Sequence, residues 1–178
     1  SRFGAWAGGG APHTPRWPHS CVVVAPAGIA AQARHRIEQG YRTLKAKIGR
    51  DSEADFGALE AVRAEIGTEI TLRVDANMGW TSAKEAVRHI EKIQAFDLEL
   101  VEQPLPPDDI EGPRFVRERV DAPIMADESV WTPTDAMQCG RHQASCVFNL
   151  LSTLHILRFR RTHPVTCRRG TYSSQLNN

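Results

Sequence analysis

The sequence predicts an α/β fold in which parallel β-strands alternate with helices. Its central part contains a segment at 43–48 in which apolar residues alternate with lysines, and mainly apolar runs at 70–74, 98–101 and 123–126. Each is followed by a segment with helical apolar spacing or a helix-start signal. Uninterrupted apolar runs are typical of strands covered on both faces, and a spacing of three to four is typical of amphipathic helices. Strand and helix therefore alternate four times, which favours a parallel sheet covered by helices.

The predicted helices are bounded by residues that commonly start or stop a helix. Residues 28–39 repeat an apolar residue every four positions, and a shorter helix is expected from 108–109 to 119 with Ile110 on its inner face. A last strand is expected within 144–150. The helix signals, in chain order, are the stop at Gly40, the start at Asp51 and Ser52, the stop at Gly67, the cap at Thr81, and the start at Thr132 and Pro133.

The two flanks differ in composition from this central part. All 21 acidic residues lie between Glu38 and Asp135, whereas residues 136–178 hold six arginines and no acid. A natural surface usually mixes the two signs. We therefore divide the chain into an atypical N-terminal segment at 1–27, a central domain at 28–149 and an irregular basic tail at 150–178. Residues 1–20 are expected to be loop or disorder, and residues 21–25 a short buried strand.

Composition excludes several classes of partner. The net charge of +1 gives no reason to expect nucleic acid or an anionic membrane. The apolar run 21–31 is broken by Pro26 and Gly28 and is shorter than the ~20 residues of a membrane helix. The four cysteines contain no CxxC pair, which favours reduced thiols in a cytoplasmic protein over a zinc or redox site. A weak secretion signal within 21–31 is the alternative to that location.

Three acidic residues follow consecutive predicted strands. Asp75, Glu102 and Asp127 are separated by 27 and 25 residues, which is roughly the length of one βα unit. Each thus occupies the carboxyl end of a strand, where open α/β sheets and β/α barrels place their chemistry. Three carboxylates that converge there repel one another unless a cation lies between them. Because oxygen ligands favour a hard ion, we expect Mg²⁺.

A pair of lysines lies on one of these strands. Lys45 and Lys47 share a face of the predicted strand 43–48, because side chains two residues apart point the same way. The apolar residues occupy the other face, so the lysine face is expected to be enclosed, as in the lumen of a barrel. A desolvated lysine beside another cation has a lowered pKa and accepts a proton near neutrality. The alternative is a solvated pair at a sheet edge.

The acidic residues also have a purely structural explanation. Asp75 is able to cap a turn, and Asp127 or Glu128 is able to cap the helix that follows. Glu102 fits such a role poorly, because Gln103 and Pro104 come directly after it. The three acids and the lysine pair all lie at the ends of four consecutive predicted strands. This coincidence favours the functional explanation.

Four motifs stand at these strand ends, namely Leu-Lys-Ala-Lys-Ile-Gly at 44–49, Arg-Val-Asp-Ala-Asn at 73–77, Val-Glu-Gln-Pro-Leu at 101–105 and Met-Ala-Asp-Glu-Ser at 125–129. Together they resemble the mandelate racemase and muconate-lactonizing branch of the enolase superfamily, in that family's order. The resemblance covers about 28–149 and implies a partial, incomplete (β/α)8 barrel of the TIM type.

The resemblance also implies roles for individual residues. Lys47 resembles the base that removes the proton α to a substrate carboxylate, and Lys45 the neighbour that contacts the carboxylate and tunes Lys47. Asn77 resembles a substrate contact. The implied Mg²⁺ ligands are Asp75, Glu102 and Asp127, with Glu128 in reserve.

The implied reaction is racemisation, epimerisation or cycloisomerisation through an enediolate, which such sites stabilise with Mg²⁺ and a Lys or His base. An acid-sugar dehydratase of the same superfamily and a catalytically inactive remnant are the alternatives. The expected partner is a small carboxylate substrate, with no nucleic acid and no membrane, and a homo-oligomer is compatible with the sequence. A nucleic-acid role for the arginine-rich tail is weak, because no known nucleic-acid-binding motif accompanies the arginines.

The sequence departs from the family pattern at both ends. Nothing resembles the family's N-terminal capping domain or its seventh and eighth strands, and no lysine follows Lys92. We therefore expect a fragment of the barrel domain whose ends derive from a shifted reading frame or a damaged gene. Charge that develops in a site without closure is stabilised less, because water enters. The chain is accordingly expected to be inactive, or nearly so, on its own.

Overall fold

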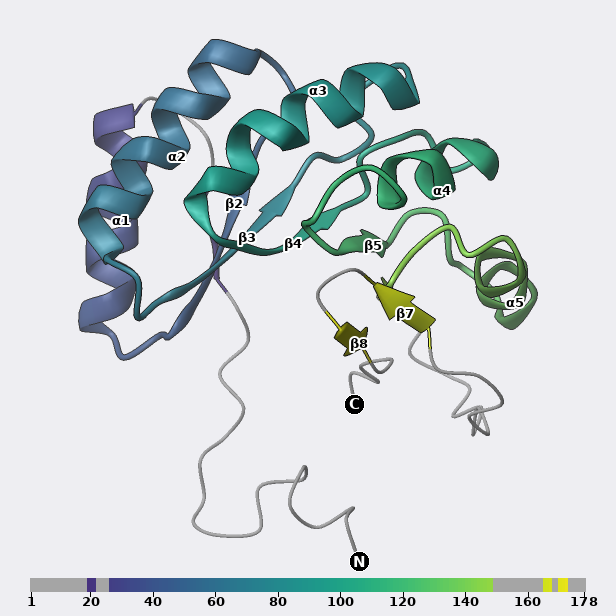
Figure 1. Cartoon of the computed structure of the whole chain (residues 1–178). Helices are drawn as coiled ribbons and strands as arrows, with labels where there is room; N and C mark the ends of the chain where they lie inside the picture. Colours follow the sequence, from purple (N-terminus) through teal and green to yellow (C-terminus); the bar gives the residue numbers. More distant parts are fainter. Residues whose placement is uncertain (1–18, 22–25, 149–164, 168–169, 173–178) are drawn as a thin grey trace, which may run out of the picture.

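A sheet of six parallel strands organises the protein, as the computed structural model shows (Figure 1). The residues that the structure describes are 19–21, 26–148, 165–167 and 170–172. The strands pair in chain order, so each one has the previous and the next as neighbours. They are β1 (His19–Cys21), β2 (Thr43–Lys47), β3 (Thr71–Asp75), β4 (Leu98–Glu102), β5 (Ile124–Ala126) and β6 (Val147–Phe148).

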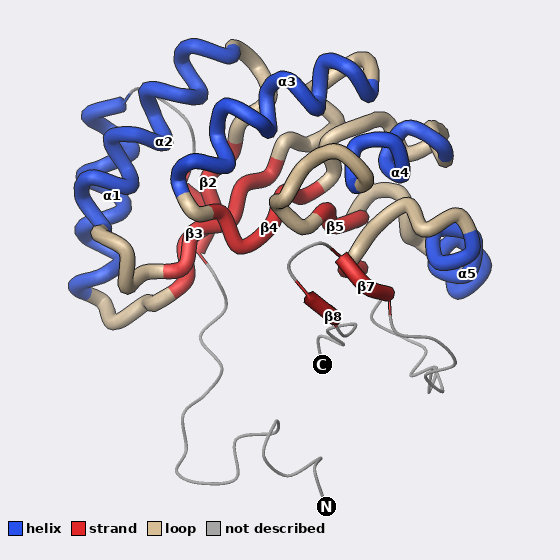
Figure 2. The backbone as a smooth tube through the Cα atoms, in the orientation of Figure 1, coloured by secondary structure: helices blue, strands red, loops and turns tan. Residues whose placement is uncertain are grey.

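Helices connect the strands and cover one side of the sheet (Figure 2). This arrangement confirms the predicted parallel α/β fold. Within the described residues β1 and β6 do not pair with each other, so the sheet is open there. The helices are α1 (Pro26–Glu38), α2 (Ser52–Ile66), α3 (Ala83–Ile93), the 3₁₀ turn η1 (Gln94–Phe96), α4 (Glu111–Arg117) and α5 (Pro133–Arg141).

The main core lies between the sheet and the helices. Alternate strand residues such as Leu44, Leu72 and Val74 point toward the helices, where Leu59 of α2 and Ile90 of α3 meet them. A smaller buried cluster of Leu100, Met125 and Cys146 is separate from this core. Because side chains on a strand alternate between faces, Leu100 and Glu102 share the face of the sheet that points away from the helices, the inner face. The inner face is therefore apolar below and charged at the carboxyl end.

Capping residues explain most of the helix boundaries. Asp51 caps α2 by accepting from the Ala54 N–H at 2.8 Å. Thr132 and Asp135 form a reciprocal capping box at the start of α5. The predicted cap at Thr81 is wrong by one residue, since Ser82 caps α3.

Other element boundaries also differ from the prediction. Helix α4 begins at Glu111 rather than at 108–109, because Asp109 accepts from the Gly112 N–H at 2.7 Å and so stays outside the helix. Ile110 is consequently 38% exposed rather than on an inner face. Strand β1 starts two residues before the expected strand at 21–25, of which residues 22–25 lie outside the described residues.

The tail contains a pair of strands that the sequence did not predict. Strand β7 (Val165–Cys167) pairs antiparallel with β8 (Gly170–Tyr172). The rest of the predicted tail at 150–178, and residues 1–18 of the N-terminal segment, lie outside the described residues. The division of the chain at 27 and 149 stays a prediction. Among the described helices, none is long and apolar enough to cross a membrane.

Candidate active site at the carboxyl end of the sheet

Strand register brings three of the predicted residues into one row. Lys47 is the partner of Asp75 across β2 and β3, and Asp75 is the partner of Glu102 across β3 and β4. Each is the last residue of its strand. Partners in a parallel sheet point to the same face, so the three side chains share the carboxyl end of the inner face.

Lys45 lies between two of the carboxylates. Its Nζ is 2.9 Å from Glu102 Oε2 and 3.2 Å from Asp75 Oδ2. Both acidic side chains are buried, and only 18% of the Lys45 side chain is exposed. The ammonium group therefore supplies the positive charge that two adjacent buried carboxylates require.

Burial and neighbouring charges shift the pKa values of Lys45 and Glu102. Burial lowers the pKa of Lys45, but its hydrogen bond with Glu102 and the charges of Glu102 and Asp75 outweigh burial, so that the pKa is raised overall. This is opposite to the lowered pKa expected of an enclosed lysine pair. Burial raises the pKa of Glu102 to about 7, against the opposing effect of Lys45.

Lys47 is the more accessible lysine, with 42% of its side chain exposed. Its Nζ lies 3.3 Å from Asp75 Oδ2 and also donates to Asn77 Oδ1. The Asn77 amide in turn donates to Glu128 Oε1 at 2.9 Å. The sequence expected Asn77 at this site, and the structure places it between the base candidate and the end of β5.

Asp127 and Glu128 complete the acidic cluster from the end of β5. Burial raises the pKa of Asp127, and the charge of Glu128 adds to the shift, although a hydrogen bond with Glu102 opposes it. A hydrogen bond between two carboxyl groups requires a proton on one of them. Glu128 Oε2 is buried and has no hydrogen-bond partner among the residues that the structure describes.

The donor set fits a divalent cation, although the described residues hold no ready-made group of three metal ligands. Lys45 and the Glu102–Asp127 hydrogen bond take up carboxylate oxygens that a cation would otherwise contact. The donors are all carboxylate oxygens, which suit Mg²⁺. The unpartnered Glu128 oxygen adds a buried negative atom beside them.

Two features of the rim, which consists of the strand ends and loops at the carboxyl end of the sheet, had no role in the sequence analysis. Gln103 was quoted within a motif without a function, and in the structure it is buried with hydrogen bonds to two loops. Gly49 and Gly79 let the loops after β2 and β3 touch, because a Cβ on Gly79 would lie 2.3 Å from the Gly49 carbonyl oxygen. Hydrophobic periodicity does not predict such contacts, because they join two loops rather than the apolar faces of helices or strands.

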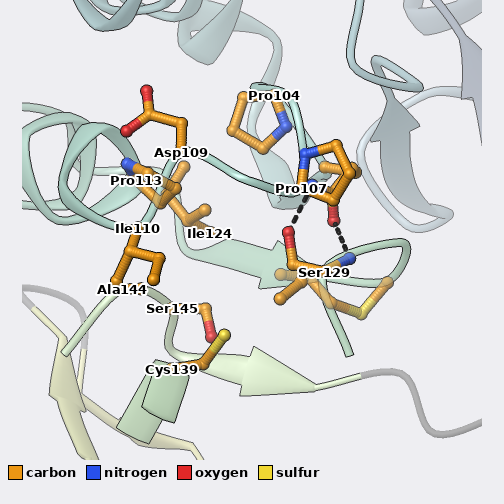
Figure 3. Close-up of a pocket in the computed structure, with 13 residues that line it drawn as sticks. Pro104, Pro107, Asp109, Ile110, Pro113, Ile124, Ser129, Cys139, Ala144 and Ser145 are labelled. Atoms are coloured by element: carbon orange, nitrogen blue, oxygen red, sulfur yellow. Dashed lines mark hydrogen bonds between the residues drawn. The ribbon is translucent and has the colours of Figure 1, made fainter. Parts of the chain in front are cut away.

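A small cavity has none of the lysines and carboxylates of the charged cluster in its lining (Figure 3). It has a volume of about 20 Å³, and its lining includes Pro107 from the loop after β4, Pro113 of α4 and Cys139 of α5. Space for about one water molecule does not accommodate an organic substrate. The lysine and carboxylate cluster, rather than this cavity, is therefore the candidate active site.

Comparison with known proteins identifies the same family that the motifs resemble. The model of the family described as "Enolase C-terminal domain-like" matches residues 28–154. An L-Ala-D/L-Glu epimerase of Bacillus subtilis is 39% identical over 145 residues, which is 80% of this chain and 39% of the relative. Muconate cycloisomerase 1 of Pseudomonas putida is 33% identical over 122 residues, covering 67% of this chain and 32% of the relative.

A solved structure is similar to the same region. The dipeptide epimerase of Enterococcus faecalis, in complex with Mg and the dipeptide L-Leu-L-Tyr, superposes with a TM-score of 0.72 at 36% identity, covering 75% of this chain and 37% of that one. The chain thus spans less than half the length of the relatives it matches. The chain belongs to the enolase C-terminal domain-like family, in the mandelate racemase and muconate-lactonizing branch of the enolase superfamily, and its sheet is part of the family's TIM-type barrel.

Proposed function

We propose that the protein removes the proton α to a carboxylate of a small substrate, in a Mg²⁺-dependent racemisation, epimerisation or cycloisomerisation. One observation carries the proposal: two lysines and three acidic residues from four adjacent strands meet at the carboxyl end of the sheet. The names of the relatives, an epimerase and a cycloisomerase, support this chemistry and do not favour the dehydratase alternative.

The two lysines have different environments, which suggests a division of roles. Lys47 is the base, because it is exposed enough to reach a substrate and, within the described part of the chain, carries one carboxylate contact, to Asp75. Lys45 is paired with two buried carboxylates and keeps its proton, since its pKa is raised. It is suited to hold a substrate carboxylate rather than to accept a proton. Asn77 orients the Lys47 ammonium through its Oδ1 atom.

The acidic residues are suited to hold the cation. Asp75, Glu102 and Asp127 are the proposed ligands, with Glu128 in reserve. Bound there, Mg²⁺ would stabilise the negative charge that develops on the substrate carboxylate as the proton leaves. Burial of Glu102 and Asp75 beside Lys45 keeps water from the inner side of the cluster.

The proposed substrate class is a dipeptide or another small carboxylate. The B. subtilis relative is named for L-Ala-D/L-Glu, and the E. faecalis structure contains L-Leu-L-Tyr. A dipeptide offers a terminal carboxylate next to an α-proton, which matches one lysine to hold the carboxylate and one to remove the proton.

The test is exchange of the substrate α-proton in D₂O, followed by NMR with L-Ala-L-Glu or L-Leu-L-Tyr and Mg²⁺. Any exchange that this partial chain catalyses is expected to be abolished by EDTA and to be at least about 100-fold slower in Lys47→Ala, since general-base catalysis contributes about that much. Lys92→Ala is the matched control, because Lys92 is an exposed lysine that pairs with the exposed Glu53, away from the cluster. Exchange that survives Lys47→Ala would contradict the proposed base. No Mg²⁺-dependent exchange in the wild-type chain would favour the inactive remnant.

A further inference from the structure

Gln103 is a buried polar residue at the centre of the rim. It follows Glu102 at the end of β4, and only 2% of it is exposed. Buried amides are costly unless their hydrogen-bonding groups are satisfied. The partners of Gln103 therefore show what its burial achieves.

The Gln103 side chain is bonded to two different loops. Its Oε1 atom accepts from the Asp127 N–H at 2.9 Å and from the Ser129 N–H at 3.2 Å. Its Nε2 atom donates to the Leu105 carbonyl at 2.8 Å and to Ser129 Oγ at 2.7 Å, and Figure 3 draws the bonds at Ser129. A side-chain amide has two donor hydrogens and two acceptor lone pairs, so all four positions are used.

The chemistry of these partners fixes the orientation of the amide. Backbone N–H groups only donate, so the oxygen must face Asp127 and Ser129, and the nitrogen must face the Leu105 carbonyl. A hydrocarbon side chain of the same length reproduces none of the four bonds. The loop after β5 thus depends on an amide at this position.

The backbone of Gln103 also forms hydrogen bonds with neighbouring segments of the rim. Its N–H donates to the Met125 carbonyl at 2.8 Å, and its carbonyl accepts from the Met78 N–H at 2.8 Å. Its φ of +39° lies in the left-handed region, which non-glycine residues seldom adopt. One residue therefore joins the segments that follow β3, β4 and β5.

We infer that Gln103 is a positioning residue that holds Asp127 at the rim for cation binding. It does so through its hydrogen bonds to the loop that carries Asp127. The inference rests on the proposed function, since it concerns the same cation. Gln103 itself contacts neither cation nor substrate in this role, and it acts through the placement of Asp127 beside Glu102. Hydrogen bonds that orient a ligand typically change metal affinity by about 10- to 100-fold when they are removed.

The test compares cation binding by full-length variants, with Mn²⁺ as the probe and electron paramagnetic resonance as the readout. Gln103→Met is expected to bind Mn²⁺ about 10- to 100-fold more weakly than wild type. Amide hydrogen exchange is expected to quicken at Asp127 and Ser129 in this variant. Arg63→Met is the matched control. Arg63 also makes four hydrogen bonds to loop carbonyls, but these belong to Phe96, Gly67, Ile70 and Asp97 at the amino end of the sheet.

The outcomes separate the two proposals. Equal Mn²⁺ affinity of Gln103→Met and wild type overturns this inference alone, as does an equal loss in Arg63→Met. A wild-type chain that binds no Mn²⁺ overturns the proposed function and this inference with it. If Gln103→Met does not fold, Ser129→Ala decides, because it removes only the Oγ acceptor. We expect its affinity to fall about 2- to 10-fold, and unchanged affinity would overturn the inference.

Discussion

The ammonium group of Lys45 is paired with two buried carboxylates at once. Its contacts with Glu102 and Asp75 are 2.9 and 3.2 Å long, and both acids are buried, with exposed fractions of 0% and 2%. Removal of one partner from a buried ion pair leaves an uncompensated charge, which costs far more than the pair itself contributes. At the scale of the residue, stability and the candidate chemistry thus depend on the same side chain.

Lys45→Met is therefore expected to lower the free energy of unfolding by about 3 kcal/mol. Urea denaturation at pH 7 measures the loss, and added Mg²⁺ is expected to restore part of it by binding the released carboxylates. Lys92→Met is the control, because the exposed Lys92–Glu53 pair should contribute less than about 1 kcal/mol. Equal losses in the two variants would contradict the role of Lys45.

Asp55 offers a second test at this scale. The residue is buried at the start of α2, and its Oδ2 atom accepts from the Gly49 N–H at 2.8 Å. Burial raises the pKa of Asp55 and the charge of Asp51 adds to the shift, whereas hydrogen bonds from Gly49 and Arg50 and the charge of His89 oppose it. A raised pKa means that the folded state binds the proton more tightly than the unfolded state.

The contribution of Asp55 is therefore greatest at acid pH and falls as the pH rises from the ordinary Asp pKa of about 3.9 through the raised value. Asp55→Asn keeps an oxygen that accepts from Gly49 but does not titrate. We expect wild type to lose stability relative to Asp55→Asn as the pH rises over this window. Urea denaturation at several pH values measures the difference, and a difference that does not change with pH would refute the prediction.

The residues of the candidate site differ in how far the sequence alone could predict them. Lys45, Lys47, Asp75 and Glu102 lie on strands, where period and spacing indicate both face and row. The role of Gln103 could not be predicted, because its partners lie up to 26 residues away in another loop. The raised pKa of Lys45 likewise depends on two carboxylates from other strands.

At the scale of elements, the loops after β2 and β3 hold the site together. Gly49 has a φ of +101°, and its backbone lies so close to the next loop that a Cβ there would be 2.6 Å from the Ala76 carbonyl oxygen. The Ile48 N–H also donates to the Asp75 carbonyl at 2.9 Å. The contact fixes the end of β2, which carries Lys47, against the end of β3.

Gly79→Ala is expected to destabilise the protein by about 1–3 kcal/mol, because its Cβ would overlap the backbone of Gly49 rather than a movable side chain. Thermal unfolding measures the loss. Gly28→Ala is the control, since nothing lies within 4 Å of a Cβ there and alanine favours a helix. If both variants unfold at the wild-type temperature, the loops are less tightly packed than the structure indicates.

Helix ends were predicted less well than helix cores. Thr81 and Ser82 are both suitable caps, and the structure uses Ser82 while Thr81 donates from its N–H and its hydroxyl to Glu85. The apolar stripe of α3 is the same whichever of the two residues caps the helix, so periodicity does not distinguish them. The start of α4 was misplaced for a similar reason, since Asp109 caps the Gly112 N–H without entering the helix.

At the scale of the whole molecule, the two ends of the sheet have different tasks. The carboxyl end gathers the lysines and acids, as is usual for α/β enzymes. At the amino end, Arg63 of α2 donates hydrogen bonds to four backbone carbonyl groups, those of Gly67, Ile70, Phe96 and Asp97. Arg63 has no candidate role in chemistry, so its hydrogen bonds serve the fold.

The order of the strands could be predicted because each βα unit places the next strand beside the last. The antiparallel pair β7 and β8 could not be predicted, since apolar residues recur with neither the two-residue period of a strand nor the 3.6-residue period of a helix around Val165–Cys167 or Gly170–Tyr172. Three-residue strands carry too few alternations to stand out from irregular sequence.

The shared row of Lys47, Asp75 and Glu102 has a consequence for how such a chain tolerates insertions and deletions. Residues added to a helix or to a loop at the amino end leave the row intact, because the strand register does not change. One residue added or removed inside β3 would turn Asp75 toward the helices and carry its charge into the apolar core. Length variation should therefore be confined to the connections, while β2, β3 and β4 keep a constant length from one variant to another.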